Sequence, residues 1–201
     1  APLMADPKIA IFIPAYNESA VIRGKLENSL ALDYPADRLE VVVASDASTD
    51  GTTRIARDFF SRGVVLFEAP TRRGKNALIN YFIPSCRGDV LVFTDANSYF
   101  HPGALKALVR PFADQTVGCV VGHLKYTHAT TAVGRGEGLY FRYEAALKAL
   151  ESKCGMLVGA TGSIYAIRAD LFEPLDLDVP NDFGHPIQIA AKGYRIVFVP
   201  A

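Results

Sequence analysis

The chain has 201 residues, of which 50% are hydrophobic, 21% charged and 10% aromatic, and this composition excludes collagen-like, disordered and disulfide-scaffold proteins. Basic and acidic residues number 21 each, so the formal net charge is zero. Nucleic-acid binding normally needs a basic surface, and we therefore expect no nucleic-acid partner. No stretch approaches the roughly 18 consecutive apolar residues of a membrane-spanning helix. The three cysteines form no C-x-x-C pair, which favours free thiols in a reducing compartment over disulfides or a zinc site.

Short apolar runs alternate with helix-like segments through the first 121 residues. Such runs, bounded by turn-forming residues, are typical of buried strands in a parallel sheet. Asn17 or Ser19 is expected to cap the first helix, and Ser48 or Asp50 the second. The alternation predicts an α/β fold, a mostly parallel, Rossmann-like sheet with helices on both faces. We expect strands at 8–14, 40–45, 64–68, 89–94 and 117–121, a helix that ends at residue 30, and helices at 52–60, 73–83 and 103–112.

In the remainder of the chain, strand-like and helix-like segments alternate less regularly. A glycine-rich segment at 134–138 is expected to form a loop, followed by a helix over 139–151. A strand at 164–168, a helix at 185–192 and a strand at 195–199 complete the predicted elements.

Polar residues gather directly after three of the predicted strands. They fall in the segments 14–18, 45–51 and 94–98. Ligands of open parallel sheets bind at the carboxyl ends of the strands, so these segments are the first candidates for a site. Two phosphate-binding motifs are absent, because Gly74-Lys75 lacks the upstream glycine of a P-loop and the 134–138 glycines have the wrong spacing for a dinucleotide fingerprint.

Asp95 and Asn97 form a D-x-N pair after the fourth strand. Hard oxygen ligands one residue apart suit Mg²⁺ or Mn²⁺, which would bridge a diphosphate. The alternative is a turn that caps the helix after Pro102. Asp182 likewise has two interpretations, since it is placed either to cap the following helix or to act as a general base.

Two further groups leave alternatives open at this point. Asp46, after the second strand, either accepts a hydrogen bond from a base N–H or holds a turn. The cluster of Arg72, Arg73 and Lys75 either binds a diphosphate or forms a solvated surface. His185 is expected to pack or cap rather than to complete a metal site.

The order of the motifs separates these alternatives. Six motifs follow one another in an order that resembles the family 2 glycosyltransferases of GT-A fold. In chain order they are P-A-Y-N-E, S-D-A-S-T-D-G-T, R-G-K-N-A-L-I-N, F-T-D-A-N-S, G-A-T-G-S-I-Y-A-I-R and N-D-F with a later K-G-Y-R. The resemblance runs from about Ile9 to Pro200 and is strongest to the membrane polysaccharide-synthase-like branch. It implies a single GT-A domain at 1–201, with a nucleotide-binding half at 1–121 and a small acceptor-side lobe at 122–201, within a longer chain.

The resemblance also assigns roles to individual residues. Asp182 matches the general base, Gly162 and Ser163 match an acceptor-side loop, and Asp95 with Asn97 matches the D-x-D metal motif for Mg²⁺ or Mn²⁺. Since Asn97 replaces an acid, weaker metal binding is expected. The positions that match contacts to the nucleotide sugar are Pro14, Ala15, Tyr16, Glu18, Asp46, Lys75, Asp95 and Ala96.

The implied activity is inverting transfer of a sugar from a nucleotide diphosphate, with UDP as the expected nucleotide, to a glycan or lipid-linked acceptor. The full-length protein is expected in the cytoplasm at the inner face of the plasma membrane, held by segments outside this chain. Ser45 and Asn97 depart from the family acids, and this motivates a catalytically silent nucleotide-sugar-binding module as the alternative. A nucleotidyltransferase is disfavoured because the segment 14–18 contains no glycine.

Overall fold

The computed structural model of the chain describes residues 6–123, 147–148, 150–152, 157, 159–160 and 163–199. The predicted glycine-rich loop at 134–138 lies outside these residues, as does most of the helix predicted over 139–151. Residues 147–148 and 150–151 of that helix are described and are helical, as is residue 152 after its predicted end.

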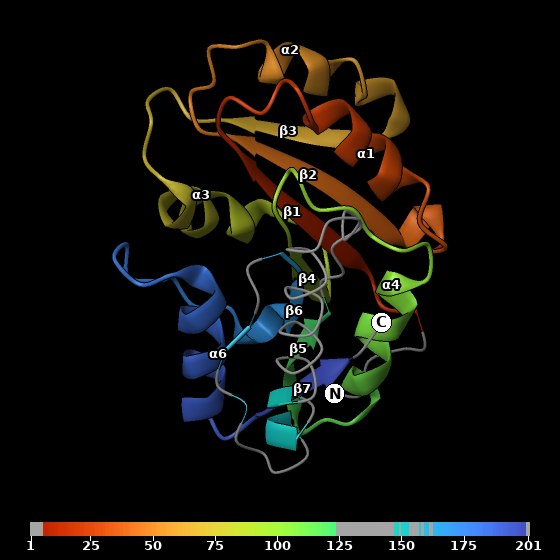
Figure 1. Cartoon of the computed structure of the whole chain (residues 1–201), viewed down its shortest axis with the longest axis vertical. Helices are drawn as coiled ribbons and strands as arrows, with labels where there is room; N and C mark the ends of the chain where they lie inside the picture. Colours follow the sequence, from red (N-terminus) through yellow and green to blue (C-terminus); the bar gives the residue numbers. More distant parts are fainter. Residues whose placement is uncertain are drawn as a thin grey trace, which may run out of the picture.

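Seven strands form one sheet in the order β3-β2-β1-β4-β6-β5-β7 (Figure 1). β1 pairs in parallel with β2 and β4, β2 with β3, and β5 with β7. β6 is antiparallel to both of its neighbours, β4 and β5. The predicted α/β class and the mostly parallel sheet are therefore confirmed. The strands are β1 (Ile9–Ala15), β2 (Leu39–Ser45), β3 (Val64–Glu68), β4 (Val90–Phe93), β5 (Val117–Gly122), β6 (Tyr165–Arg168) and β7 (Arg195–Val199).

Both faces of the sheet are buried because the side chains of each central strand alternate between two apolar clusters. In β1, Ile9, Ile11 and Ile13 join one cluster, while Ala10 and Phe12 join the other. The first cluster packs against α1 (Ile22–Leu30), α2 (Thr52–Arg57) and α4 (Ala104–Val109). The second packs against α3 (Lys75–Phe82) and α6 (Asn181–Ala191). The predicted helices on both faces are therefore present (Figure 1).

Helix starts are the least accurate part of the sequence prediction. α1 begins at Ile22, and neither Asn17 nor Ser19 caps it, since the position before it is Val21 with no side-chain cap. The Asn17 side chain instead accepts a hydrogen bond from the Thr49 backbone N–H at 2.8 Å. Long-range partners therefore outcompete local capping here.

α6 begins four residues earlier than predicted, at Asn181. Asp182 therefore lies inside the first helical turn, and its interpretation as an N-cap is wrong. A negative side chain is favourably placed at this end of a helix. Among the described residues, no helix is both long enough and apolar enough to cross a membrane.

Candidate functional site

A cleft of ≈ 260 Å³ lies at the carboxyl ends of β1, β2 and β4, where the sequence predicted a site. The parallel pairing of these strands brings their three polar segments to one edge of the sheet. All the residues predicted to contact a nucleotide sugar line this cleft, together with Asn97 and with Leu78, which the sequence did not single out. The full lining is Pro14, Ala15, Tyr16, Glu18, Asp46, Lys75, Leu78, Asp95, Ala96 and Asn97.

Asp46 connects the β2 end of the cleft to the start of α3. Its side chain accepts hydrogen bonds from the backbone N–H groups of Arg73, at 2.7 Å, and Gly74, at 2.9 Å. Gly74 has a φ of 87°, which a side chain would strain. Asp46 is 4% exposed. It therefore holds the turn that begins α3, as the structural alternative proposed, and it also lines the cleft.

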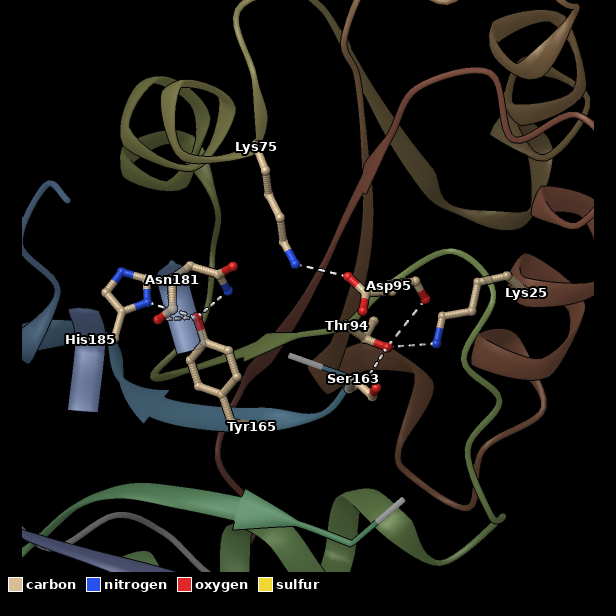
Figure 2. A network of polar contacts seen from close by, with 8 residues as sticks. All are labelled: Lys25, Lys75, Thr94, Asp95, Ser163, Tyr165, Asn181 and His185. Atoms are coloured by element: carbon tan, nitrogen blue, oxygen red, sulfur yellow. Dashed lines mark hydrogen bonds and ion pairs between the residues drawn. The ribbon is translucent and has the colours of Figure 1, made fainter. Parts of the chain in front are cut away.

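Lys75, the first residue of α3, extends into the cleft and meets Asp95. Its Nζ lies 2.8 Å from Asp95 Oδ1, and both side chains are about one-third exposed, at 34% and 39% (Figure 2). Lys75 thus has a different partner from Arg72 of the predicted basic cluster. Arg72 stacks over the Tyr16 ring, with its guanidinium carbon 3.9 Å from the ring centroid. Lys75 and Arg72 therefore contact different residues of the cleft lining.

Asp95 and Asn97 form a partial donor set for a divalent cation. They contribute one carboxylate and one amide oxygen, and no group of three or more His, Cys, Asp or Glu side chains in the described part of the chain could hold a metal. Mg²⁺ and Mn²⁺ bind in such sites through one or two protein oxygens, with substrate phosphates and water as the remaining ligands. The residues therefore fit a cation that is completed by a diphosphate.

The segment after β1 is braced by the loop after β2. Glu18 N donates to Thr52 Oγ1 at 2.8 Å, and Ser19 N donates to Asp50 Oδ2 at 2.9 Å. Hydrogen bonds, first of all from the Thr52 hydroxyl, hold the pKa of the Asp50 carboxyl well below its usual range. An ionised Asp50 keeps these bonds strong. The backbone beside Tyr16 is therefore held in place before any ligand binds.

Asp182 lies beside the cleft and is not part of its lining. It is half-buried, and its carbonyl accepts a hydrogen bond from Ala160 N at 2.8 Å. Burial raises the pKa of Tyr165 well above its ordinary value, and the carboxylates of Asp182 and Asp95 both add to this rise. Tyr165 pairs with Phe93 in the sheet, two residues before Asp95. Its hydroxyl accepts a hydrogen bond from Asn181, so the first turn of α6, which contains Asp182, lies near this end of β4.

Tyr165 fixes the first turn of α6, as Figure 2 shows. Its hydroxyl accepts a hydrogen bond from Asn181 Nδ2 at 2.7 Å and lies 2.8 Å from His185 Nδ1. Burial lowers the pKa of His185 to about 3, so the ring is neutral at physiological pH. The His185 ring packs 4.8 Å from the Phe93 ring, between centroids. His185 is therefore a packing residue, as expected.

The acceptor-side prediction is placed only in part. Gly162 lies outside the described residues. The carbonyl of Ser163 accepts a hydrogen bond from Thr94 Oγ1 at 2.9 Å, which joins it to the segment that carries Asp95. The acceptor role of both residues stays a prediction.

Two residues of this network, Lys25 and Tyr165, escaped the sequence analysis, and Thr94 was included in the candidate segment 94–98 without a role of its own. Lys25 carried a signal, because it occupies the same helical face as Ile22 and Leu26, which are fully buried. A lysine at a core-facing position is unusual. The roles of Thr94 and Tyr165 depend on partners about 70 and 16 residues away, and no local pattern marks such contacts.

Comparison with known proteins agrees with the architecture. The family model for glycosyl transferase family 2 matches residues 10–171. A probable glycosyltransferase, YdaM of Bacillus subtilis, is 31% identical over 97% of this chain and 49% of its own length. The hyaluronan synthase of Streptococcus pyogenes is 27% identical over 84% of this chain and 42% of its own length.

A solved structure is also similar over the whole chain. The mannosyltransferase PcManGT of Pyrobaculum calidifontis, in complex with GDP-Man and Mn²⁺, superposes with a TM-score of 0.84 at 31% identity, covering 100% of this chain and 57% of that one. The chain spans about half the length of the curated relatives it matches. On the family match, the identity to YdaM and the shared fold, the chain belongs to glycosyl transferase family 2.

Proposed function

We propose that the chain is the catalytic domain of an inverting glycosyltransferase, which moves a sugar from a nucleotide diphosphate to an acceptor hydroxyl. One observation carries the proposal: Asp46, Lys75 and Asp95, from three distant segments, line a single cleft beside the helix that carries Asp182. In this proposal the base binds near Tyr16 and Asp46, and the diphosphate binds near Lys75 and Asp95.

The protein residues have distinct tasks in the reaction. Lys75 stabilises the negative charge that develops on the leaving diphosphate. Asp182 takes the proton of the acceptor hydroxyl while that oxygen attacks the anomeric carbon from the face opposite the diphosphate. The anomeric C–O bond breaks, and its electron pair leaves with the diphosphate. A single displacement of this kind inverts the anomeric configuration, so an α-linked donor gives a β-linked product.

A divalent cation is part of the proposal. Asp95 and Asn97 would hold Mg²⁺ or Mn²⁺, which as a Lewis acid offsets charge on the diphosphate. The Mn²⁺ that accompanies GDP-Man in PcManGT supports the use of a divalent metal with the nucleotide sugar. That complex also makes GDP a competitor to the expected UDP, and the choice between the two nucleotides is decided by experiment. The acceptor, whether a glycan or a lipid-linked sugar, and the placement at the inner face of the plasma membrane stay predictions.

The test is a screen of UDP-sugars and GDP-sugars for release of the nucleotide diphosphate, with and without Mn²⁺. We expect Mn²⁺-dependent release with one donor class, and a loss of about 10²-fold or more in Asp182→Asn, the usual range for removal of a general base. Asp178→Asn is the matched control, since Asp178 is an exposed acid in the loop that precedes α6. Nucleotide binding without release by the wild-type protein would instead support the silent binding module.

A further inference from the structure

Lys25 is fully buried, at 0% exposure, in the middle of α1. Its Nζ donates to Thr94 Oγ1 at 3.0 Å and to the carbonyl of Ser98 at 2.6 Å. The same Nζ lies 3.8 Å from the centroid of the Phe100 ring. Figure 2 shows Lys25 reaching the Thr94–Asp95 segment from one side while Lys75 reaches it from another.

Fold stability does not explain a lysine at this position. Desolvation lowers the pKa of Lys25 to about 7, and attraction to Asp95 only partly opposes this. Lys25 belongs to none of the direct ion pairs found among the described residues. An apolar side chain of similar length would fill the same space without removing a charge from water. Residues that work against stability in this way are typically retained for function.

Both hydrogen bonds of Lys25 fall on the turn that carries Asp95 and Asn97. Ser98 N donates to Asp95 O at 3.2 Å and closes this Thr94–Ser98 turn. The Lys25 ammonium binds both ends of the turn. One helical turn further along α1, Asn28 holds the backbone N–H and carbonyl of Phe100, at 2.8 and 2.9 Å. α1 therefore holds the turn and also Phe100, two residues after its end.

Thr94 extends this connection to the acceptor side. Its hydroxyl accepts from Lys25 and donates to the carbonyl of Ser163, at 2.9 Å. A continuous polar chain thus runs from α1, through the end of β4, to the segment that begins β6. These three elements are tied together through the Thr94 hydroxyl.

We propose that Lys25 is a positioning residue of the donor site: its buried ammonium group clamps the Thr94–Ser98 turn and so holds Asp95 and Asn97 in place to bind the diphosphate. The proposal rests on the proposed function, because it takes this turn as the donor diphosphate site. Lys25 touches none of the reacting groups and acts through the turn.

The first test measures the turn itself and needs no nucleotide. Hydrogen exchange of the Ser98 and Tyr99 amides is compared between the wild-type protein, Lys25→Met and a control, Lys106→Met. Lys106 is a half-exposed residue of α4 that pairs with Asp33, and neither residue belongs to the Thr94–Ser98 turn or to the cleft lining. We expect exchange at least tenfold faster in Lys25→Met and unchanged in Lys106→Met. Unchanged exchange in Lys25→Met overturns the proposal.

The second test measures function in the same variants. We expect the affinity for UDP or GDP at saturating Mn²⁺, measured by calorimetry, to fall at least fivefold in Lys25→Met, while its midpoint of urea unfolding at pH 7 equals or exceeds that of the wild type. A merely structural lysine predicts the opposite pair, a lowered midpoint with unchanged nucleotide affinity, and that result overturns the proposal. If the wild type binds neither nucleotide, the proposed function fails. The hydrogen-exchange measurement then still tests whether Lys25 holds the Thr94–Ser98 turn.

A second variant covers the case in which Lys25→Met does not fold. Thr94→Val keeps the shape of the side chain and removes the hydroxyl that accepts from Lys25. The proposal predicts faster exchange of the Ser98 amide and weaker nucleotide binding in this variant too. Wild-type exchange and wild-type affinity in Thr94→Val overturn it.

Discussion

Replacement of Tyr165 by phenylalanine tests how the first turn of α6 is held. The hydroxyl of Tyr165 is the hydrogen-bond partner of Asn181 Nδ2, at 2.7 Å, and of His185 Nδ1, at 2.8 Å. Asn181 and His185 are 4% and 1% exposed, so water does not replace the lost partner. A buried polar group without a partner costs about 1–3 kcal/mol. With two such groups, and allowing for the desolvation of the hydroxyl itself, we expect Tyr165→Phe to lose about 2–4 kcal/mol of unfolding free energy.

Equilibrium unfolding in urea measures this loss. Tyr81→Phe is the matched control, because Tyr81 is 70% exposed and its variant is expected to stay within about 0.5 kcal/mol of the wild type. Since Asp182 lies in the turn that Tyr165 holds, Tyr165→Phe is also expected to lower kcat while the affinity for the nucleotide is unchanged. If Tyr165→Phe unfolds at the same urea concentration as Tyr81→Phe, the hydroxyl does not hold α6 and the reasoning is refuted.

Three further results are expected. Proton NMR of the first product formed from an α-linked donor is expected to show a β-linkage, and retention of the α configuration would contradict the single displacement. The pKa of Lys25 is about 7 in the folded protein and about 10.5 when unfolded, so the unfolded chain binds more protons between these values and stability rises with pH. The unfolding free energy of the wild type is expected to rise by at most about 1.4 kcal/mol per pH unit. Urea unfolding of Lys25→Met is the check, because this variant is expected to show no such rise. Arg168 is 5% exposed and donates to the carbonyls of Phe112, Asp114 and Val117. Arg168→Met is therefore expected to lose about 2–4 kcal/mol of unfolding free energy in urea. A loss below about 0.5 kcal/mol would show that those carbonyls find other partners.

The strands were predictable because a buried parallel sheet leaves a simple signal. Each strand is a short run of apolar residues, and the run at 195–199 matches β7 at both ends. The antiparallel insertion of β6 between β4 and β5 was not predicted. Strand order depends on long-range packing, and local periodicity does not report it.

The helix starts failed for a related reason. Asparagine is a common helix-capping residue, yet the Asn17 side chain bonds to a loop 32 residues away, and Asn17 itself has a φ of 54°. The start of α6 was missed because Asp182 was expected to precede the helix, whereas the helix begins at Asn181, whose amide donates to the Tyr165 hydroxyl in the sheet. In both places a tertiary hydrogen bond decides the backbone conformation.

The cleft was predicted well because its residues follow the strands directly. Strand ends in a parallel sheet meet at one edge, so Asp46 and Asp95 were expected to lie together before any coordinates were known. The polar groups beneath the cleft were not predicted, because Lys25 and Tyr165 are buried and act through partners far along the chain. The sequence thus indicates the surface of the site better than its support.

The most direct test of the account is a crystal structure of the protein with Mn²⁺ and the nucleotide diphosphate that it binds more tightly, UDP or GDP. We expect the base beside Tyr16 and Asp46, the diphosphate within reach of Lys75, and the metal on Asp95. A nucleotide bound outside this cleft, or a diphosphate that contacts neither Lys75 nor Asp95, would contradict the central claim.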